Sequence, residues 1–398
     1  MSQTLLLVEP IAALSTAPQP VVKPRKSSRY ESLDLWRGAA CLAVVIYHTT
    51  MQVVPAATRG DTFLAKLGHL LVQGTGILWV GVPMFFVISG YCIFATLEKS
   101  MSRSDSIGTY FFRRFRRIYP PYWIALAVCA AAIVAVEIAA SPGLLTKGYF
   151  SVVQPISLNA GQWIGNLTLT ESWREHLFGS STSFILPHVW TLCYEEQFYA
   201  VAGLILLVAP KRMYAAAAVV SLVVAATMVL SKKLGVSVEG TFLDGRWLLF
   251  AAGILVFYAV NRATPRGRTV ICVVLGTAAV LMLATGSVPW AFHLNRSLER
   301  FTAVVFALTL VLLYRFDAKI CAARWLAPIF ACGTMCYSLY LTHALVAKVI
   351  GHGMHRLGAN GPWETLLVGV PLSMAISAAV GWTFYLTVER RFLNGPSR

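Results

Sequence analysis

The stretch LDLWRGAACLAVVIYHTTMQVV, residues 33–54, is apolar enough to form a membrane-spanning helix, yet it contains an arginine and a histidine. Ionisable side chains inside a membrane are costly, so those that occur there usually have a function. Arg37 and His48 are eleven residues apart, which in an α-helix is three turns plus about 20°, so both share one face, about 16 Å apart along the axis. We expect that face to point into protein or a wet cavity, where an imidazole can act as a general base and a guanidinium can hold an anion. The alternative is a polar pair that only packs a helix bundle.

The composition predicts an all-α, polytopic integral membrane helix bundle. Hydrophobic residues make up 57% and charged residues 13% of the 398, which is more apolar than a soluble globular chain normally is. Apolar runs close to the 20 residues that a bilayer requires predict about ten transmembrane helices. These runs lie at 34–54, 77–97, 119–140, 188–208, 213–231, 243–260, 269–286, 300–315, 328–349 and 365–388.

The charges between these runs predict the orientation, because Lys and Arg are enriched on the cytoplasmic side. Most of the 33 Lys and Arg residues face inward if the N-terminus is cytoplasmic, so both termini are expected inside, in a multi-pass protein of the plasma (inner) membrane. We expect a disordered cytoplasmic tail at 1–32, a transmembrane domain at 33–390 and a C-terminal cytoplasmic tail at 391–398. Topology and the lipid bilayer account for the formal charge of +16, so no nucleic-acid partner is predicted. The eight cysteines show neither a disulfide framework nor a metal-site spacing.

Two further motifs combine charge with a membrane location. The segment YFFRRFRRIYPPYW at 110–123 places four arginines before the third span, which suits either a topology signal or a phosphate-rich ligand. The segment PHVWTLCYEEQFY at 187–199 places Glu195 and Glu196 about two turns into the fourth span. Buried carboxylates need a partner or a proton, and Arg37 is a possible partner.

Other segments supply small, aromatic and imidazole side chains. In VPMFFVISGYCIF at 82–94, Ser89 and Gly90 would allow close approach of a neighbouring helix or of a thin ligand arm. In MCYSLYLTHALV at 335–346, His343 is either a satisfied bundle residue or part of a site. The outer loop 141–187 offers aromatic and hydrogen-bonding groups that suit a sugar. The candidates for contacts with an acceptor are Trp163, Trp173, His188 and His343.

Taken in order, LDLWRGAACLAVVIYH, FFVISGY, RRFRRIYP, HVWTLCYEEQFY and YSLYLTH resemble the motifs of the acyltransferase 3 family of membrane acyltransferases. The resemblance covers nearly the whole chain. It implies a cytoplasmic acyl-CoA, with acetyl-CoA as the expected co-substrate and no permanently bound cofactor. It also implies an acceptor hydroxyl on a cell-surface glycan or lipid-linked sugar, or, in some members, on a macrolide. Some members carry a fused C-terminal hydrolase-like domain for glycan acceptors. We see no such domain in the sequence up to Arg398, so the identity of the acceptor stays open.

Residue by residue, the resemblance makes Arg37 and His48 the family's arginine and histidine pair. It assigns the acyl-CoA phosphates to Arg113, Arg114 and Arg117, and it matches Ser89, Gly90 and Tyr91 to a small-small-aromatic motif beside the ligand. It matches Glu195 or Glu196 to a functional carboxylate, without choosing between them. Thr191 and Cys193 stand where the family commonly has serine and alanine.

The chemistry of a thioester agrees with these assignments. A CoA thioester is already activated, so the enzyme must deprotonate the acceptor hydroxyl and stabilise the oxyanion. His48 is the candidate base, and a transient acyl-histidine is the alternative. Arg37 would contact CoA or pair with a glutamate. A secondary transporter or a membrane scaffold would also have such helices, and a single cavity joining the arginines to His48 would favour acyl transfer.

Overall fold

A computed structural model describes residues 30–53, 62–139, 153–179, 181–286, 295–359 and 361–393, and every regular element among them is helical. The first half contains α1 (Leu33–Val53), α2 (Phe63–Thr75), η1 (Gly76–Val80), α3 (Gly81–Ser102), α4 (Ile107–Ala139), η2 (Pro155–Ser157), α5 (Ala160–Thr168), α6 (Glu171–Phe178), η3 (Pro187–Val189) and α7 (Trp190–Val208). It is followed by η4 (Pro210–Arg212), α8 (Met213–Leu234), η5 (Phe242–Asp244), α9 (Arg246–Asn261), α10 (Pro265–Ala284), α11 (Arg296–Leu313), η6 (Tyr314–Phe316) and α12 (Asp317–Ala322). The last part contains η7 (Arg324–Leu326), α13 (Ala327–Thr334), α14 (Cys336–Arg356), α15 (Pro362–Glu364), η8 (Thr365–Gly369), α16 (Val370–Phe384), η9 (Tyr385–Glu389) and α17 (Arg390–Phe392).

Seven helices in the described part of the chain are long and apolar enough to cross a membrane, or eight if the bent pair 324–334 and 336–356 is one span. The chain is therefore a multi-pass membrane protein, but the predicted number of about ten spans is not confirmed. The expected spans at 34–54 and 243–260 are the helices α1 and α9, which are not among the seven. Helix α9 has 16 residues, or about 24 Å, which is short for a hydrocarbon layer of about 30 Å.

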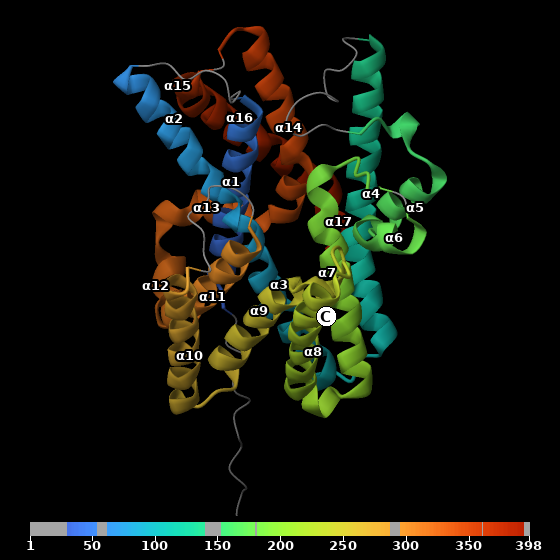
Figure 1. The fold of residues 1–398 in the computed structure, drawn as a ribbon, viewed down its shortest axis with the longest axis vertical. Helices are drawn as coiled ribbons and strands as arrows, with labels where there is room; N and C mark the ends of the chain where they lie inside the picture. Colours follow the sequence, from blue (N-terminus) through green and yellow to red (C-terminus); the bar gives the residue numbers. More distant parts are fainter. Residues whose placement is uncertain are drawn as a thin grey trace, which may run out of the picture.

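Helix α3 lies at the centre of the bundle and packs against α1, α7, α9 and α11 (Figure 1). Its contact with α9 is close because Gly90 and Gly253 lack side chains. A Cβ on Gly90 would lie 2.0 Å from the carbonyl oxygen of Phe250, and a Cβ on Gly253 would lie 1.8 Å from that of Val87. Small residues at such crossings let two backbones approach each other in a membrane.

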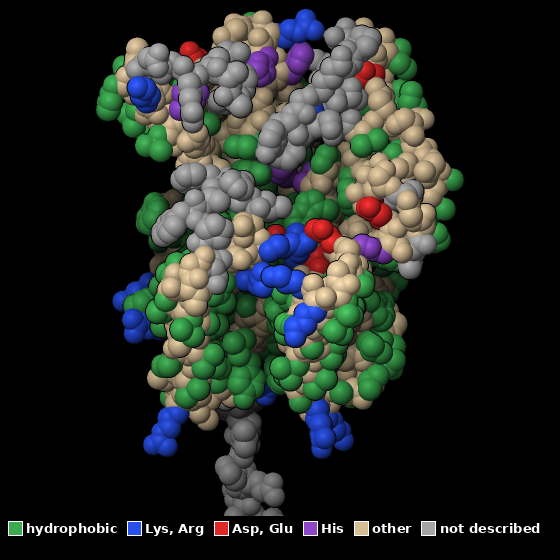
Figure 2. Space-filling view, in the orientation of Figure 1, with side chains coloured by type: hydrophobic (Ala, Val, Ile, Leu, Met, Phe, Trp, Pro, Cys, Tyr) green, Lys and Arg blue, Asp and Glu red, His purple; other side chains and the backbone are tan. Residues whose placement is uncertain are grey.

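The outer helices present apolar side chains to their surroundings. Leu222 of α8 is 71% exposed and Val280 of α10 is 64% exposed, as expected for side chains that contact lipid. Figure 2 shows this on one face, where hydrophobic side chains cover the lower half and Lys and Arg gather at its lower edge. Acidic and basic side chains meet at mid-height on the same face.

Several expected boundaries were wrong. The second span begins earlier than predicted, because α2, η1 and α3 form one helical segment from Phe63 to Ser102. The arginine segment does not precede the third helix but is part of it, because α4 begins at Ile107. The segment 141–187, which we expect on the outer side, contains α5 and α6, and these lie beside α4 (Figure 1). Helices as short as α5 and α6, with nine and eight residues, are marginal on their own and depend on packing against α4.

The expected tails fall mostly outside the described residues, but their inner ends are seen. Tyr30 is only 2% exposed, and its hydroxyl donates to the carbonyl oxygen of Leu310 at 2.9 Å. The backbone N–H of Ser32 donates to Asp317 at 2.9 Å. Residues 30–32, which we had assigned to a disordered tail, are thus packed against α11 and α12.

Candidate active site

A cavity of about 470 Å³ lies inside the bundle between α1, α3, α4, α7, α14 and the C-terminal helical turns. Both Arg37 and His48 line it, so it extends about 16 Å along α1. The prediction that this face of the first helix points into a cavity is confirmed. The other polar side chains that line it include Asp34, Ser89, Arg114, Arg117, His188, Thr191, Glu195, Tyr199, Tyr337, Tyr340 and Glu389.

The arginines of α4 divide between the cavity and the surface. Arg114 and Arg117 line the cavity. Arg114 donates to the hydroxyl of Thr96 at 2.6 Å, and its guanidinium carbon lies 5.1 Å from the ring centroid of Tyr199. Arg113 instead forms an ion pair with Asp105 at 2.5 Å and is not a lining residue. The cavity end near the start of α4 therefore carries two guanidiniums rather than the three assigned from the family resemblance.

The two neighbouring glutamates also differ in their surroundings. Glu195 lines the cavity and accepts hydrogen bonds from Ser89 at 2.9 Å and from Tyr199 at 2.5 Å. Glu196 is not a lining residue. Its carboxylate accepts a hydrogen bond from Tyr119 at 3.4 Å. The position of Glu195 makes it the glutamate that can act on a molecule inside the cavity.

Arg37 does not pair with either glutamate. It forms an ion pair with Asp34 at 2.5 Å, and its other terminal nitrogen lies 2.8 Å from the sulfur of Cys92. Asp34, Arg37 and Cys92 all line the cavity. Of the two possibilities for Arg37, a glutamate partner is excluded in this structure, and contact with a ligand in the cavity stays a prediction.

The motif of Ser89, Gly90 and Tyr91 is split between the cavity and the packing of α3. Ser89 faces the cavity, whereas Gly90 faces α9 at the close crossing described above. Tyr91 is buried with its ring 6.0 Å from that of Tyr30 and 5.1 Å from that of Phe257. The structure therefore places Gly90 and Tyr91 away from any ligand in the cavity, because successive helical residues point in different directions.

Three histidines from distant parts of the chain form a cluster at the far end of the cavity. The ring centroid of His343 lies 5.2 Å from that of His48 and 5.0 Å from that of His188. His343 Nδ1 donates to the carbonyl oxygen of Tyr340 at 2.8 Å, so the lone pair of the neutral ring lies on Nε2. Among the described residues, no group of His, Cys, Asp and Glu side chains is arranged to hold a metal ion.

A second, much smaller pocket of about 30 Å³ reaches His48 and His188 from another side. It lies between α1, α4, α14 and the segment before α7, and it shares His48, Pro187 and His188 with the large cavity. Its volume suits about one water molecule or one hydroxyl group. His48 and His188 therefore lie between the two spaces, whereas His343, which we expected to contact an acceptor, lines neither of them.

The two tryptophans expected to bind an acceptor lie elsewhere. Trp163 of α5 is half-buried against the hydrophobic core, and Trp173 belongs to α6. Neither of them lines the large cavity or the small pocket. Helices α5 and α6 are fixed to the side of α4, where Tyr122 donates to the carbonyl oxygen of Asn166 at 2.6 Å.

The lining residues missed in the sequence include Glu389, Tyr340 and Trp190, which come from its last part and from α7. Glu389 accepts hydrogen bonds from the backbone N–H and the hydroxyl of Ser338, at 3.0 and 2.5 Å. Tyr340 donates to the carbonyl oxygen of His188 at 2.8 Å. Trp190, the first residue of α7, lines the cavity as well. An acidic residue near the end of an apolar run was the available signal for Glu389.

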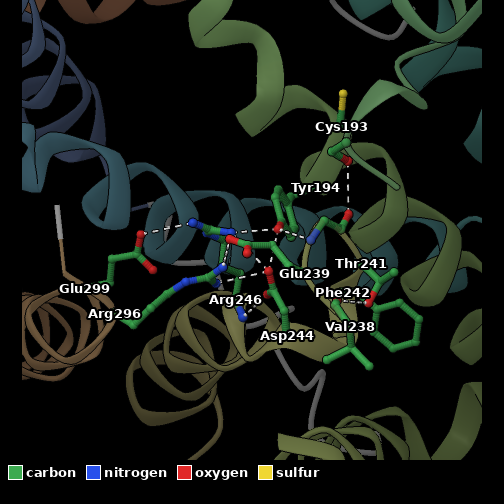
Figure 3. A network of polar contacts seen from close by, with 12 residues as sticks. Cys193, Tyr194, Val238, Glu239, Thr241, Phe242, Asp244, Arg246, Arg296 and Glu299 are labelled. Atoms are coloured by element: carbon green, nitrogen blue, oxygen red, sulfur yellow. Dashed lines mark hydrogen bonds and ion pairs between the residues drawn. The ribbon is translucent and has the colours of Figure 1, made fainter. Parts of the chain in front are cut away.

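A buried charge cluster lies behind the wall of the cavity (Figure 3). Arg246 is 5% exposed and contacts Asp244 at 3.0 Å and Glu299 at 3.3 Å. It also donates to the hydroxyl of Tyr194 at 2.6 Å. Arg296 bridges Asp244 to the exposed Glu239 at 3.0 and 2.7 Å. The cluster thus joins α7, the segment before α9 and the start of α11.

Comparisons with known proteins give a consistent result. A family model described as an acyltransferase domain matches residues 30–382. Acyltransferase MdmB of Streptomyces mycarofaciens is 25% identical over an alignment of 394 positions, which covers 92% of this chain and 92% of that protein. The putative acetyltransferase ORF330 of Acidianus two-tailed virus is 24% identical over 324 residues, 79% of this chain and 82% of that protein.

A relative with a named substrate is similar over a smaller part. The peptidoglycan O-acetyltransferase OatA of Listeria monocytogenes is 26% identical over 193 residues, which are 46% of this chain and 26% of that protein. The chain thus aligns with about a quarter of the peptidoglycan enzyme. No solved structure matches the chain.

Proposed function

We propose that this chain is an acyl-CoA-dependent O-acyltransferase of the plasma membrane. The premise is that it belongs to the acyltransferase family whose model covers residues 30–382. It would move an acyl group, with acetyl as the expected one, from cytoplasmic acyl-CoA to a hydroxyl. The observation that carries the proposal is the single cavity lined by Arg114 and Arg117 at one end and by His48 at the other. Family membership favours acyl transfer over transport.

The arginine end suits the charged part of the donor. Guanidiniums recognise phosphate groups through paired, charge-assisted hydrogen bonds, and Arg114 and Arg117 are the cavity's cations closest to the start of α4. With the CoA phosphates held there, the pantetheine arm would extend past Ser89 and Glu195 towards the histidines. Arg37 lines the same path and would bind a polar group of the arm.

The histidine end suits the chemistry. A neutral imidazole of His48 would take the proton of the acceptor hydroxyl as its oxygen attacks the thioester carbon, after which the C–S bond breaks and CoA leaves as the thiol. His343 lies next to His48, and His188 lies next to His343, so the two rings would share the proton. In the alternative, the acyl group first moves to a nitrogen of His48 and then to the hydroxyl.

The acceptor hydroxyl would approach through the small pocket, which reaches His48 from another side. A cell-surface glycan is the first candidate acceptor, supported by the relative named for peptidoglycan. A small molecule such as a macrolide is the second. It is supported by the positions of Trp163 and Trp173, neither of which lines the cavity or the small pocket.

The test is replacement of the proposed base. His48→Ala should abolish ester formation while CoA binding, measured as a thermal shift of the purified protein, is retained. His352→Ala is the matched control, because His352 lies on α14 but lines neither space. Mass spectrometry of esters in cells with and without the gene would identify the product. Full activity of His48→Ala would remove the proposal.

A further inference from the structure

The wall of the cavity beside the histidines is apolar and aromatic. Trp190 lines the cavity and follows His188 by two residues. Val82 lines it as well, next to Gly81, whose Cβ position is 2.8 Å from the side chain of Val44 on α1. Phe86 is one turn further along α3 and also lines the cavity. An apolar group bound at the histidine end would therefore contact these three side chains.

Trp190 is held in place on several sides. The guanidinium carbon of Arg246 lies 4.5 Å from its ring centroid. The ring of Tyr194 stands nearly perpendicular to it at 5.9 Å, and that of Phe86 contacts it at 6.5 Å. Among cation–π interactions, a cation over the face of an indole is the most favourable, and the attraction is stronger when water is excluded.

Arg246 is itself unable to move easily. Figure 3 shows it between Glu299 on one side and Tyr194 and Asp244 on the other. Both of its carboxylate partners are buried. Glu299 is 2% exposed, and the side chain of Asp244 is 4% exposed. Separating buried charges is strongly unfavourable, so the cluster keeps the guanidinium, and with it the indole, in one position.

We propose, resting on the proposed function, that Trp190, held by Arg246, limits the length of the acyl group. The thioester carbon must lie at His48 for attack, so the acyl carbons beyond it extend into the wall that Trp190 helps to form. On this proposal a methyl group is short enough to leave the indole in place. Longer chains would have to displace an indole that is held by the buried charge cluster. Trp190 is thus the proposed specificity residue, and Arg246 a positioning residue for it.

The experiment supplies acetyl-CoA and butyryl-CoA at equal concentration to membrane vesicles containing the protein, and measures acetate and butyrate released from the ester products. The wild type should form acetyl esters at least about 100-fold faster, since one methylene in a pocket is worth about 10- to 200-fold. Trp190→Ala should raise the butyryl share by about tenfold or more. Arg246→Lys keeps the charge but loses the planar stack, and should raise it by a smaller factor.

The control is Trp247→Phe, because Trp247 is fully buried beside Arg246 in the chain yet does not line the cavity. This variant should lower the rates of acetyl and butyryl ester formation by the same factor, as any loss of folded protein would, and leave the ratio of the two products unchanged. If Trp190→Ala does not fold, Trp190→Phe is used and should shift the ratio in the same direction. A wild type that uses both donors equally, or an unchanged ratio in the Trp190 variants, overturns the inference. A wild type that forms no ester from either donor overturns the proposed function first.

Discussion

Glu195 and Glu196 are adjacent in the chain but face different surroundings, and this difference can be tested. Only Glu195 lines the cavity, where Ser89 and Tyr199 hold its carboxylate. Glu195→Gln should reduce transfer by about tenfold or more, because the carboxylate lies on the proposed path of the pantetheine arm and a hydrogen bond to a charged group contributes about 1.5–3 kcal/mol. Glu196→Gln should stay within about threefold of the wild type. Thermal unfolding of both variants shows whether the protein is intact, and equal losses in the two would contradict the assignment.

The arginines of α4 lead to a second comparison between neighbours. Arg117 lines the cavity, whereas Arg113 is paired with Asp105 outside it. Arg117→Gln should raise the KM for acyl-CoA by about tenfold or more, because a hydrogen bond to a charged group contributes about 1.5–3 kcal/mol. Arg113→Gln should change the KM by less than about threefold. A titration of acyl-CoA at fixed acceptor measures both, and a larger effect at Arg113 would reverse the assignment.

At the scale of single residues, the sequence showed which positions carry chemistry better than it showed their directions. Arg37, His48 and Ser89 were predicted to face a site, and all three line the cavity. Gly90 was assigned to the ligand although it packs against α9. Motif residues one position apart share a pattern in the sequence but not a side of the helix. Only the neighbouring helices decide which of them meets the ligand.

Among the elements, the crossing of α3 and α9 is the contact that tolerates substitution least. An added Cβ on Gly90 would overlap the backbone of Phe250, so Gly90→Ala should destabilise the protein by about 1–3 kcal/mol, as overpacking does. Gly353→Ala is the control, since a Cβ there meets open space within α14. Thermal unfolding in detergent compares the two. A Gly90→Ala protein as stable as the control would show that the crossing is looser than described.

The elements themselves were predictable where an apolar run is long and bounded by charge. Helices α7, α8 and α10 fall close to their expected ranges. The start of α4 was missed because four arginines interrupt the apolar pattern, although they suit the end of a helix that leaves the membrane. The bend of 79° between the helices 324–334 and 336–356 has no signal in the apolar pattern, since both arms are apolar.

For the whole molecule, the orientation stays a prediction that a reporter can test. A green fluorescent protein fused to the C-terminus should fluoresce, because we expect that end in the cytoplasm, where Lys and Arg are enriched. Alkaline phosphatase at the same place should be inactive, and it should be active when inserted between α10 and α11. An active phosphatase at the C-terminus would reverse the orientation and place the arginine end of the cavity outside.

The site as a whole could not be read from any one segment. His48, His188 and His343 lie on three elements separated by more than a hundred residues in the chain, and the ring of His343 lies 5.2 and 5.0 Å from those of His48 and His188. Apolar periodicity predicts helices but not which of them are neighbours. The family resemblance supplied most of the residues, and packing supplied Tyr340, Glu389 and the partners of Arg37.

The shared partition at His48 and His188 has an electrical consequence. The large cavity reaches these two histidines from one side and the small, mainly apolar pocket reaches them from another, so the part of a membrane voltage that falls between the two spaces falls across this partition. Moving one elementary charge through 100 mV corresponds to about 2.3 kcal/mol. The free energy of an imidazolium formed between the large cavity and the small pocket would therefore depend directly on the membrane voltage.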